Sequence, residues 1–118
     1  MSWKKVPRKN EESLEDLAGH FPQAYKRTMF GCPAWFINGN MFAAAHEENI
    51  IVRLAEKDRE EALEEEGITP FAPMPGRAMR EYVTLEPSLL SQRERLESWF
   101  EKAVDYVLTL PPKEKKRK

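Results

Sequence analysis

The sequence predicts an α+β fold in which helices flank an antiparallel sheet of about five strands. Short apolar runs separated by turns fill residues 34–54, which is the pattern of a β-meander. Stretches with helical spacing or helix-forming composition lie before this region, after it and near the C-terminus, and they predict N-terminal, middle and long C-terminal helices. A chain of 118 residues is expected to form one domain with one core.

The N-terminal part is expected to contribute one short helix. Residues 1–10 are polar and are expected to be flexible, and a single folded domain is expected over residues 11–110. Three apolar residues with helical spacing predict a helix over residues 12–19, with Asn10 as its N-cap and Gly19 as its stop. Residues 23–28 could add another helical turn.

Three strands are expected to follow as antiparallel neighbours. Residues 34–37 and 41–46 flank Asn38-Gly39, a dipeptide that strongly favours a two-residue hairpin turn. Residues 50–54 follow a second short turn and add the third strand.

The hairpin turn also predicts which side chains share a face. An undistorted two-residue turn pairs Phe36 with Met41 and Ala34 with Ala43, and directly paired residues lie on the same side. A pairing of Ala45 with Val52 extends this face to the third strand. The expected core face, which the helices should cover, then contains Ala34, Phe36, Met41, Ala43, Ala45, Ile50 and Leu54.

The second half of the chain alternates helix and strand signals. Residues 56–66 predict a charged helix that Gly67 ends. Residues 69–76 are rich in proline, which favours an edge strand or an extended loop. Residues 80–85 alternate as a further strand and end at Pro87.

The clearest helix covers residues 92–110. Ser88 or Ser91 could cap it, and Pro111-Pro112 stops it. Its single apolar stripe contains Leu96, Trp99, Phe100, Ala103, Val107 and Leu110.

The face of the sheet opposite the expected core combines aromatic and basic residues. The candidate interface or ligand residues there are Trp35, Phe42, His46, Arg53, Arg77, Arg80 and Tyr82. A merely solvated face rarely carries Trp and Phe. Three uses therefore stay open: a helix covers this face too, it contacts a second copy or another protein, or it binds a small ligand.

Residues that carry chemistry are few. Arg77 and Arg80 flank a glycine-containing turn that could hold a phosphate or carboxylate, or could serve only as a rigid crossing. Cys32 is either a reactive thiol or a small buried side chain. His20 and His46 belong to no metal-binding pattern, and the sequence contains no cofactor or catalytic motif. We therefore expect no metal and no cofactor, and the sequence favours a non-enzymatic protein over an enzyme.

Charge and cysteine content suggest a compartment and a class of partner. The net charge is −1, while residues 111–118 form a basic tail that is either a solvated, disordered end or a contact for nucleic acid or an acidic protein. The cationic residues of the tail are Lys113, Lys115, Lys116, Arg117 and Lys118. One cysteine, no apolar run of membrane-spanning length and a polar N-terminus without a signal peptide favour the cytoplasm.

Several motifs together resemble the TfoX N-terminal domain family across residues 26–106. They are Met29-Phe30-Gly31, Asn38-Gly39 before Met41-Phe42-Ala43, Arg53-Leu54 at a strand end, and Pro73-Met74-Pro75-Gly76-Arg77 leading to Tyr82. Cys32-Pro33 stands where many members have a second glycine.

The resemblance implies a bacterial α+β domain similar in fold to the type III secretion chaperone-like class. Longer members act in competence regulation as co-activators with the cyclic-AMP receptor protein and carry a second, C-terminal domain. We expect this chain to be a stand-alone member without that second domain, acting as a non-enzymatic regulatory or protein-interaction module. The alternative is a small anionic-ligand-binding protein or minor enzyme that uses the arginine and aromatic face.

Overall fold

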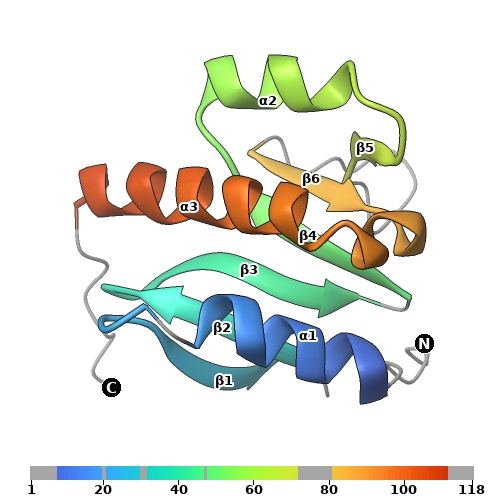
Figure 1. Cartoon of the computed structure of the whole chain (residues 1–118). Helices are drawn as coiled ribbons and strands as arrows, with labels where there is room; N and C mark the ends of the chain where they lie inside the picture. The colour runs from blue at the N-terminus through green and yellow to red at the C-terminus, as the bar shows by residue number, and fades with distance from the viewer. Residues whose placement is uncertain (1–7, 20, 30–31, 47, 72–80, 112–118) are drawn as a thin grey trace.

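The computed structural model of the chain is an α+β fold, as the sequence predicts (Figure 1). It describes residues 8–19, 21–29, 32–46, 48–71 and 81–111. Within them, the elements in chain order are α1 (Arg8–Ala18), β1 (Tyr25–Met29), β2 (Cys32–Ile37), β3 (Asn40–His46), β4 (Asn49–Arg53), α2 (Glu56–Leu63), β5 (Ile68–Pro70), β6 (Tyr82–Leu85), the 3₁₀ helix η1 (Pro87–Ser91) and α3 (Arg93–Thr109).

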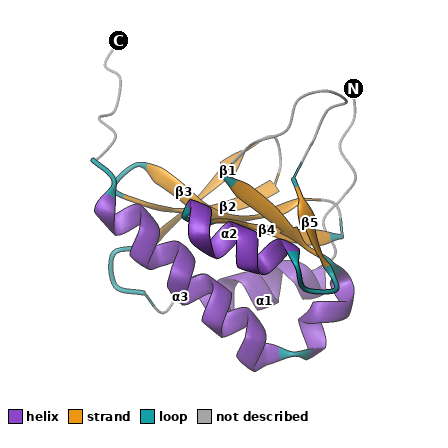
Figure 2. Ribbon diagram, turned by 90° about the horizontal axis from the view of Figure 1, so that it is seen from above, coloured by secondary structure: helices purple, strands orange, loops and turns teal. Residues whose placement is uncertain are grey.

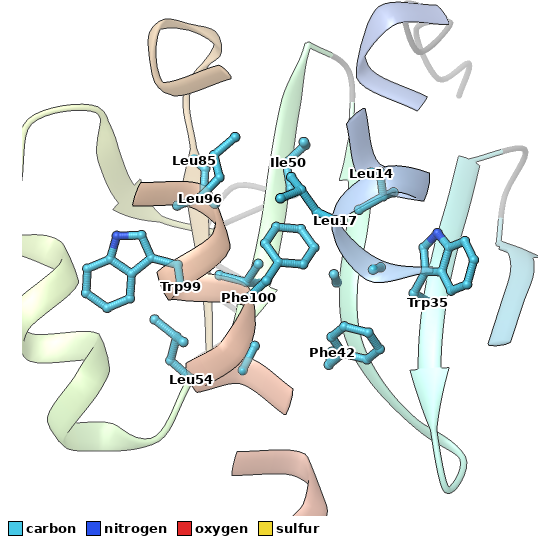
Figure 3. Packing of buried hydrophobic residues seen from close by; sticks show 14 of the residues in the cluster. Leu14, Leu17, Trp35, Phe42, Ile50, Leu54, Leu85, Leu96, Trp99 and Phe100 are labelled. Carbon is cyan, nitrogen blue, oxygen red and sulfur yellow. The ribbon is translucent and has the colours of Figure 1, made fainter. Parts of the chain in front are cut away.

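The strands form one antiparallel sheet of six strands in the order β1-β2-β3-β4-β6-β5. The helices α1, α2 and α3 all lie on one side of this sheet (Figure 2). The main hydrophobic core fills the space between these two layers (Figure 3). We call the opposite side the helix-free face, because none of the described helices lies on it.

The predicted apolar stripes of α1 and α3 both face the core. The three apolar residues of α1 are buried, and the helix ends at Ala18, one residue before Gly19. On α3 the stripe is buried from Leu96 to Val107. Helix burial of this kind supplies most of the stability of a short amphipathic helix.

Three predicted helix ends are wrong, each because a tertiary contact or a tighter turn takes over. Asn10 lies inside α1 rather than at its cap, and its side-chain amide donates to the backbone carbonyl of Glu48 at 2.6 Å. Helix α2 ends at Leu63, so Gly67, with φ of 88°, lies in the turn before β5. No serine caps α3, because η1 intervenes and Gln92 occupies the N-cap without a side-chain hydrogen bond.

Strand β1 replaces the helical turn predicted for residues 23–28. It pairs along its whole length with β2, from Tyr25 opposite Phe36 to Met29 opposite Cys32. Its side chains from Tyr25 to Thr28 are exposed, so the strand has no apolar alternation that the sequence could reveal. Pairing with a neighbour, rather than local propensity, therefore fixes this strand.

The Asn38-Gly39 turn forms as predicted. Both residues have positive φ, 53° for Asn38 and 82° for Gly39, which is the signature of a type I′ turn. The turn closes the pairs Ile37–Asn40 and Phe36–Met41. The backbone N–H of Gly39 also donates to the hydroxyl of Tyr25 at 3.1 Å, which ties the turn to β1.

A β-bulge beyond these pairs overturns the rest of the predicted register. Trp35 pairs with Ala43 and Ala34 pairs with Ala44, so Phe42 is the extra residue in β3. The predicted pairing of Ala34 with Ala43 is wrong.

The bulge exchanges side chains between the two faces. Trp35, Ile37 and Phe42 lie in the helix-covered core, whereas Ala34, Phe36 and Met41 lie on the helix-free face. In β3 the predicted faces hold beyond the bulge, so Ala43 and Ala45 remain in the core. Ala45 pairs with Ile50 rather than with Val52, and this shift by two residues keeps every side chain of β4 on its predicted face.

Strands β5 and β6 occupy the far side of the sheet. Strand β5 is an edge strand, as proline at its last residue requires, and β6 lies between it and β4. The predicted strand over residues 80–85 is seen as β6, and residues 72–76 of the proline-rich stretch lie outside the described residues. No helix in the described part of the chain has the length and apolar character to span a bilayer.

Gly39 provides a test of the hairpin. Its φ of 82° is strained for a β-branched residue, so Gly39→Val should lower the free energy of unfolding by about 1–3 kcal/mol. Gly39→Asn, which tolerates this conformation better, should cost clearly less. Urea denaturation of the three proteins measures the difference, and equal midpoints for Gly39→Val and wild type would rule out the strained turn.

Candidate functional site

The helix-free face carries a second, smaller hydrophobic cluster. Its members are Ala34, Phe36, Ala44, Ile51 and Phe71, with Met41 and Tyr82 packed against them. Phe71 follows β5 and is 6% exposed. Its ring meets the ring of His46 edge-on, with the centroids 5.2 Å apart. This face is therefore apolar at its centre and has polar or charged groups around it.

Trp35 and Phe42 do not belong to this face, which corrects the sequence prediction. Phe42 is fully buried among core residues (Figure 3). It packs edge-to-face on Phe21, with ring centroids 6.3 Å apart. Trp35 is 9% exposed and lies beneath the end of α1, where a Cβ added to Gly19 would be 3.3 Å from its ring. The β-bulge is the reason for both placements.

The other predicted site residues separate into three groups. Arg53 and Tyr82 are paired neighbours on β4 and β6, as predicted. His46 lies on the predicted face but pairs with Asn49, at the opposite end of β4 from Arg53. Arg77 and Arg80 lie outside the described residues, as do the cationic residues of the tail.

Arg53 is the centre of a polar cluster at one end of the sheet. Its Nε donates to Oε1 of Glu81 at 2.7 Å, and a terminal guanidinium nitrogen lies 2.6 Å from the same oxygen. The guanidinium carbon is 5.7 Å from the ring centroid of Tyr82 and 5.8 Å from that of Tyr106. One cation thus joins β4, the residue before β6 and helix α3.

The cluster shifts the pKa of its acidic members in opposite directions. Partial burial alone would raise the pKa of Glu81, but the hydrogen bond and charge of Arg53, with a hydrogen bond from Tyr106, hold it below its ordinary value. Burial and the nearby Glu81 carboxylate raise the pKa of Tyr106. Burial also raises the pKa of Tyr82, whose hydroxyl donates to the backbone carbonyl of Met41 at 3.1 Å.

This arrangement limits what Arg53 can bind. Glu81 already occupies the Nε edge of the guanidinium, which is where an external phosphate or carboxylate would make a bidentate contact. An anionic ligand that binds through this edge would have to displace that carboxylate. In the described part of the chain, no group of three His, Cys, Asp or Glu side chains could hold a metal ion. Cys32 is buried, which fits the expectation of a small buried side chain.

The part of the helix-free face over β1 and β2 has a second arginine–aromatic arrangement. The ring of Tyr25 stacks on that of Phe36 with centroids 5.8 Å apart and an interplanar angle of 19°. The guanidinium carbon of Arg27 lies 5.7 Å from the centroid of Phe36. Tyr25 is 41% exposed, which is more than the other aromatic residues of this face.

Sequence reasoning missed several residues of this face and of the Arg53 cluster. They are Tyr25, Arg27, Phe36, Met41, Phe71, Glu81 and Tyr106. Tyr25 and Arg27 could have been found from the sequence, because residues two positions apart lie on the same face if residues 25–29 form a strand. Tyr106 gave no such signal, because its contact with Arg53 forms only when α3 packs on the sheet.

Comparison with known proteins identifies the family of this domain. The family model described as the TfoX N-terminal domain matches residues 15–107, which extend from α1 into the last part of α3. None of the curated proteins compared with the chain matches it.

The burial of Trp35 gives a prediction that separates packing from surface function. Trp35→Ala should lower the free energy of unfolding by about 3–5 kcal/mol, because a large side chain leaves a cavity under α1. Trp35→Phe should cost clearly less, since the indole Nε1 has no hydrogen-bond partner in the described structure. Thermal and urea unfolding measure both changes. A Trp35→Ala variant as stable as the wild type would contradict the burial of Trp35.

The lowered pKa of Glu81 predicts a dependence of stability on pH. The carboxylate's contribution should be fully present above its ordinary pKa of 4.5 and should be lost as the pH falls through the lower value of the folded state. The contribution should be at most about 1 kcal/mol, because the side chain is 38% exposed. Glu81→Gln should flatten the stability curve below pH 5, and Glu60→Gln on α2 should not; parallel curves for Glu81→Gln and wild type would contradict the pairing.

Proposed function

The chain belongs to the TfoX N-terminal domain family, and we propose that it is a non-enzymatic regulatory or protein-interaction module. Its partner binds on the helix-free face of the sheet. The single cysteine of the chain supports a location in the bacterial cytoplasm, where such a module would act.

The observation that carries this proposal is the arginine–aromatic pairing on both sides of Met41. Arg27 lies over Phe36 on one side, and Arg53 lies over Tyr82 on the other. Arginine and aromatic side chains are enriched at the centres of protein interfaces. An aromatic ring offers a large contact area with only two torsions to fix. Met41 lies between the two pairs and is partly exposed. Methionine adapts readily to the shape of a partner.

The alternative of an anionic ligand has less support. Arg53 would need to release Glu81 before it could bind a phosphate or carboxylate through the Nε edge of its guanidinium. The other two arginines of that hypothesis, Arg77 and Arg80, lie outside the described residues. Protein contact needs no such release, since the neighbouring Tyr82 and Met41 are partly exposed and can meet a partner while the ion pair stays formed.

Site-specific photo-crosslinking tests the proposal. Benzoylphenylalanine placed at Met41, in cells that express the chain, should form adducts with another protein. The control position is Glu60, an exposed residue of α2 on the helix side of the sheet. Adducts that form at position 41 and not at position 60 support the proposed interface. Identical adducts at both positions, or none with any other protein, would contradict it.

A further inference from the structure

We propose that the outer edge of β1 pairs with β1 of a second copy of this chain, antiparallel and centred on Lys26. This pairing would join two sheets into one continuous sheet across a two-fold axis. The inference deepens the proposed function, on which it rests, by naming one partner of the module and the strand that it contacts.

The edge of β1 is open in the described structure. β1 is the terminal strand of the sheet, its described pairing is with β2 alone, and its side chains from Tyr25 to Thr28 are exposed. An exposed strand edge presents a row of N–H and C=O groups to any further strand.

The hairpin shows which residues of β1 direct these groups outward. In a two-residue hairpin the flanking pair, here Ile37 and Asn40, is hydrogen-bonded, so alternate residues of β2 bond toward β3. The backbone polar groups of Trp35 and Pro33, two and four residues before Ile37, therefore also point toward β3. Their partners on β1, Lys26 and Thr28, therefore direct theirs to the open edge. Pro33 fits this phase, because it has no N–H to give to Thr28.

The charge on Lys26 does not block self-pairing. Its Nζ lies 2.9 Å from a carboxylate oxygen of Glu15 and 3.6 Å from one of Glu11, both on α1. Two copies meeting at Lys26 would therefore bring together two ion-paired lysines rather than two bare cations. Each lysine could then reach carboxylates of either copy.

The side chains of β1 on the helix-free face favour one register of the pairing between the two copies. When Lys26 faces Lys26 of the second copy, Arg27 lies opposite Tyr25 of the second copy, and the same contact occurs twice. An arginine beside a tyrosine ring is a favourable cross-strand pair. A register centred one residue later would place Arg27 opposite Arg27, which is a repulsive like-charge pair. The sequence around Lys26 is therefore complementary to itself in one register.

The helix layer leaves room for the second copy. Helix α1 contacts the sheet mainly through β3 and β4, so it is set back from the outer edge of β1. A second backbone at the ordinary spacing of about 4.8 Å would therefore lie beside the Glu11 and Glu15 side chains that reach Lys26, rather than against the backbone of α1.

Sedimentation equilibrium of the full chain tests self-association directly. A contact limited to one strand edge is small, so we expect a monomer–dimer equilibrium with a dissociation constant on the order of 100 μM. Thr28→Pro removes an outward N–H and should weaken the dimer at least about tenfold. Thr28→Ala retains that N–H and should dimerise as the wild type does. A single species of monomer mass at about 1 mM wild-type protein, or equal association of the two variants, would overturn the proposal.

Cysteine crosslinking tests the register and remains informative if Thr28→Pro fails to fold. Under mild oxidation, Lys26→Cys should give the strongest disulfide-linked dimer, because residue 26 faces itself at the two-fold axis. Arg27→Cys should give less, and the wild type, whose only cysteine is the buried Cys32, should give little. The strongest dimer from Arg27→Cys, or equal yields at both positions, would overturn this register. Crosslinks from Met41 to another protein with a strictly monomeric chain would leave the proposed function standing and remove only this inference.

Discussion

The β-bulge at Phe42 is the feature on which the rest of this structure depends. At the bulge, two residues of β3, Phe42 and Ala43, lie opposite the single residue Trp35, so both of these β3 side chains enter the core. Without it, the strong turn at Asn38-Gly39 would direct Phe36 and Met41 toward the helices. The bulge thus delivers two large rings, those of Trp35 and Phe42, to the layer under α1 and leaves the smaller cluster around Phe36 on the other face.

Local signals explain which parts of the fold the sequence could predict. The turn at Asn38-Gly39, the stripe of α3 and the strand at β4 are each specified by residues close together in the chain. The bulge is not, because β2 and the first half of β3 are apolar on both faces and alternation cannot fix their phase. Strand β1 was missed for the opposite reason, since all of its described side chains between Tyr25 and Thr28 are exposed. The candidate site shows the same limit: Arg53 and Tyr82 were found from strand alternation, whereas Glu81 and Tyr106 join them only through tertiary packing.

The Arg53 cluster shows how a surface charge can take part in the architecture. The guanidinium lies at the end of β4, where it contacts a carboxylate next to β6 and a tyrosine ring of α3. At the same end, the side-chain amide of Asn40 donates to the carbonyl of Pro111 at 3.2 Å, so the residue after the hairpin turn is linked to the segment following α3. These polar contacts join the sheet to its longest helix at a point where apolar packing ends. They also hold the rings of Tyr82 and Tyr106 in fixed positions, and a preorganised surface loses less entropy when a partner binds.

Edge pairing and face binding would use different parts of β1 and could therefore operate together. The proposed contact between copies is made by backbone groups of Lys26 and Thr28, which lie in the plane of the sheet. The proposed partner surface is made by side chains perpendicular to that plane, with Arg27 and Tyr25 at its margin. Joining two sheets edge to edge would place two helix-free faces side by side as one surface of twice the area. A partner that contacts both halves would gain from their linkage, so a weak contact between copies would strengthen the binding of a symmetric or repeated partner.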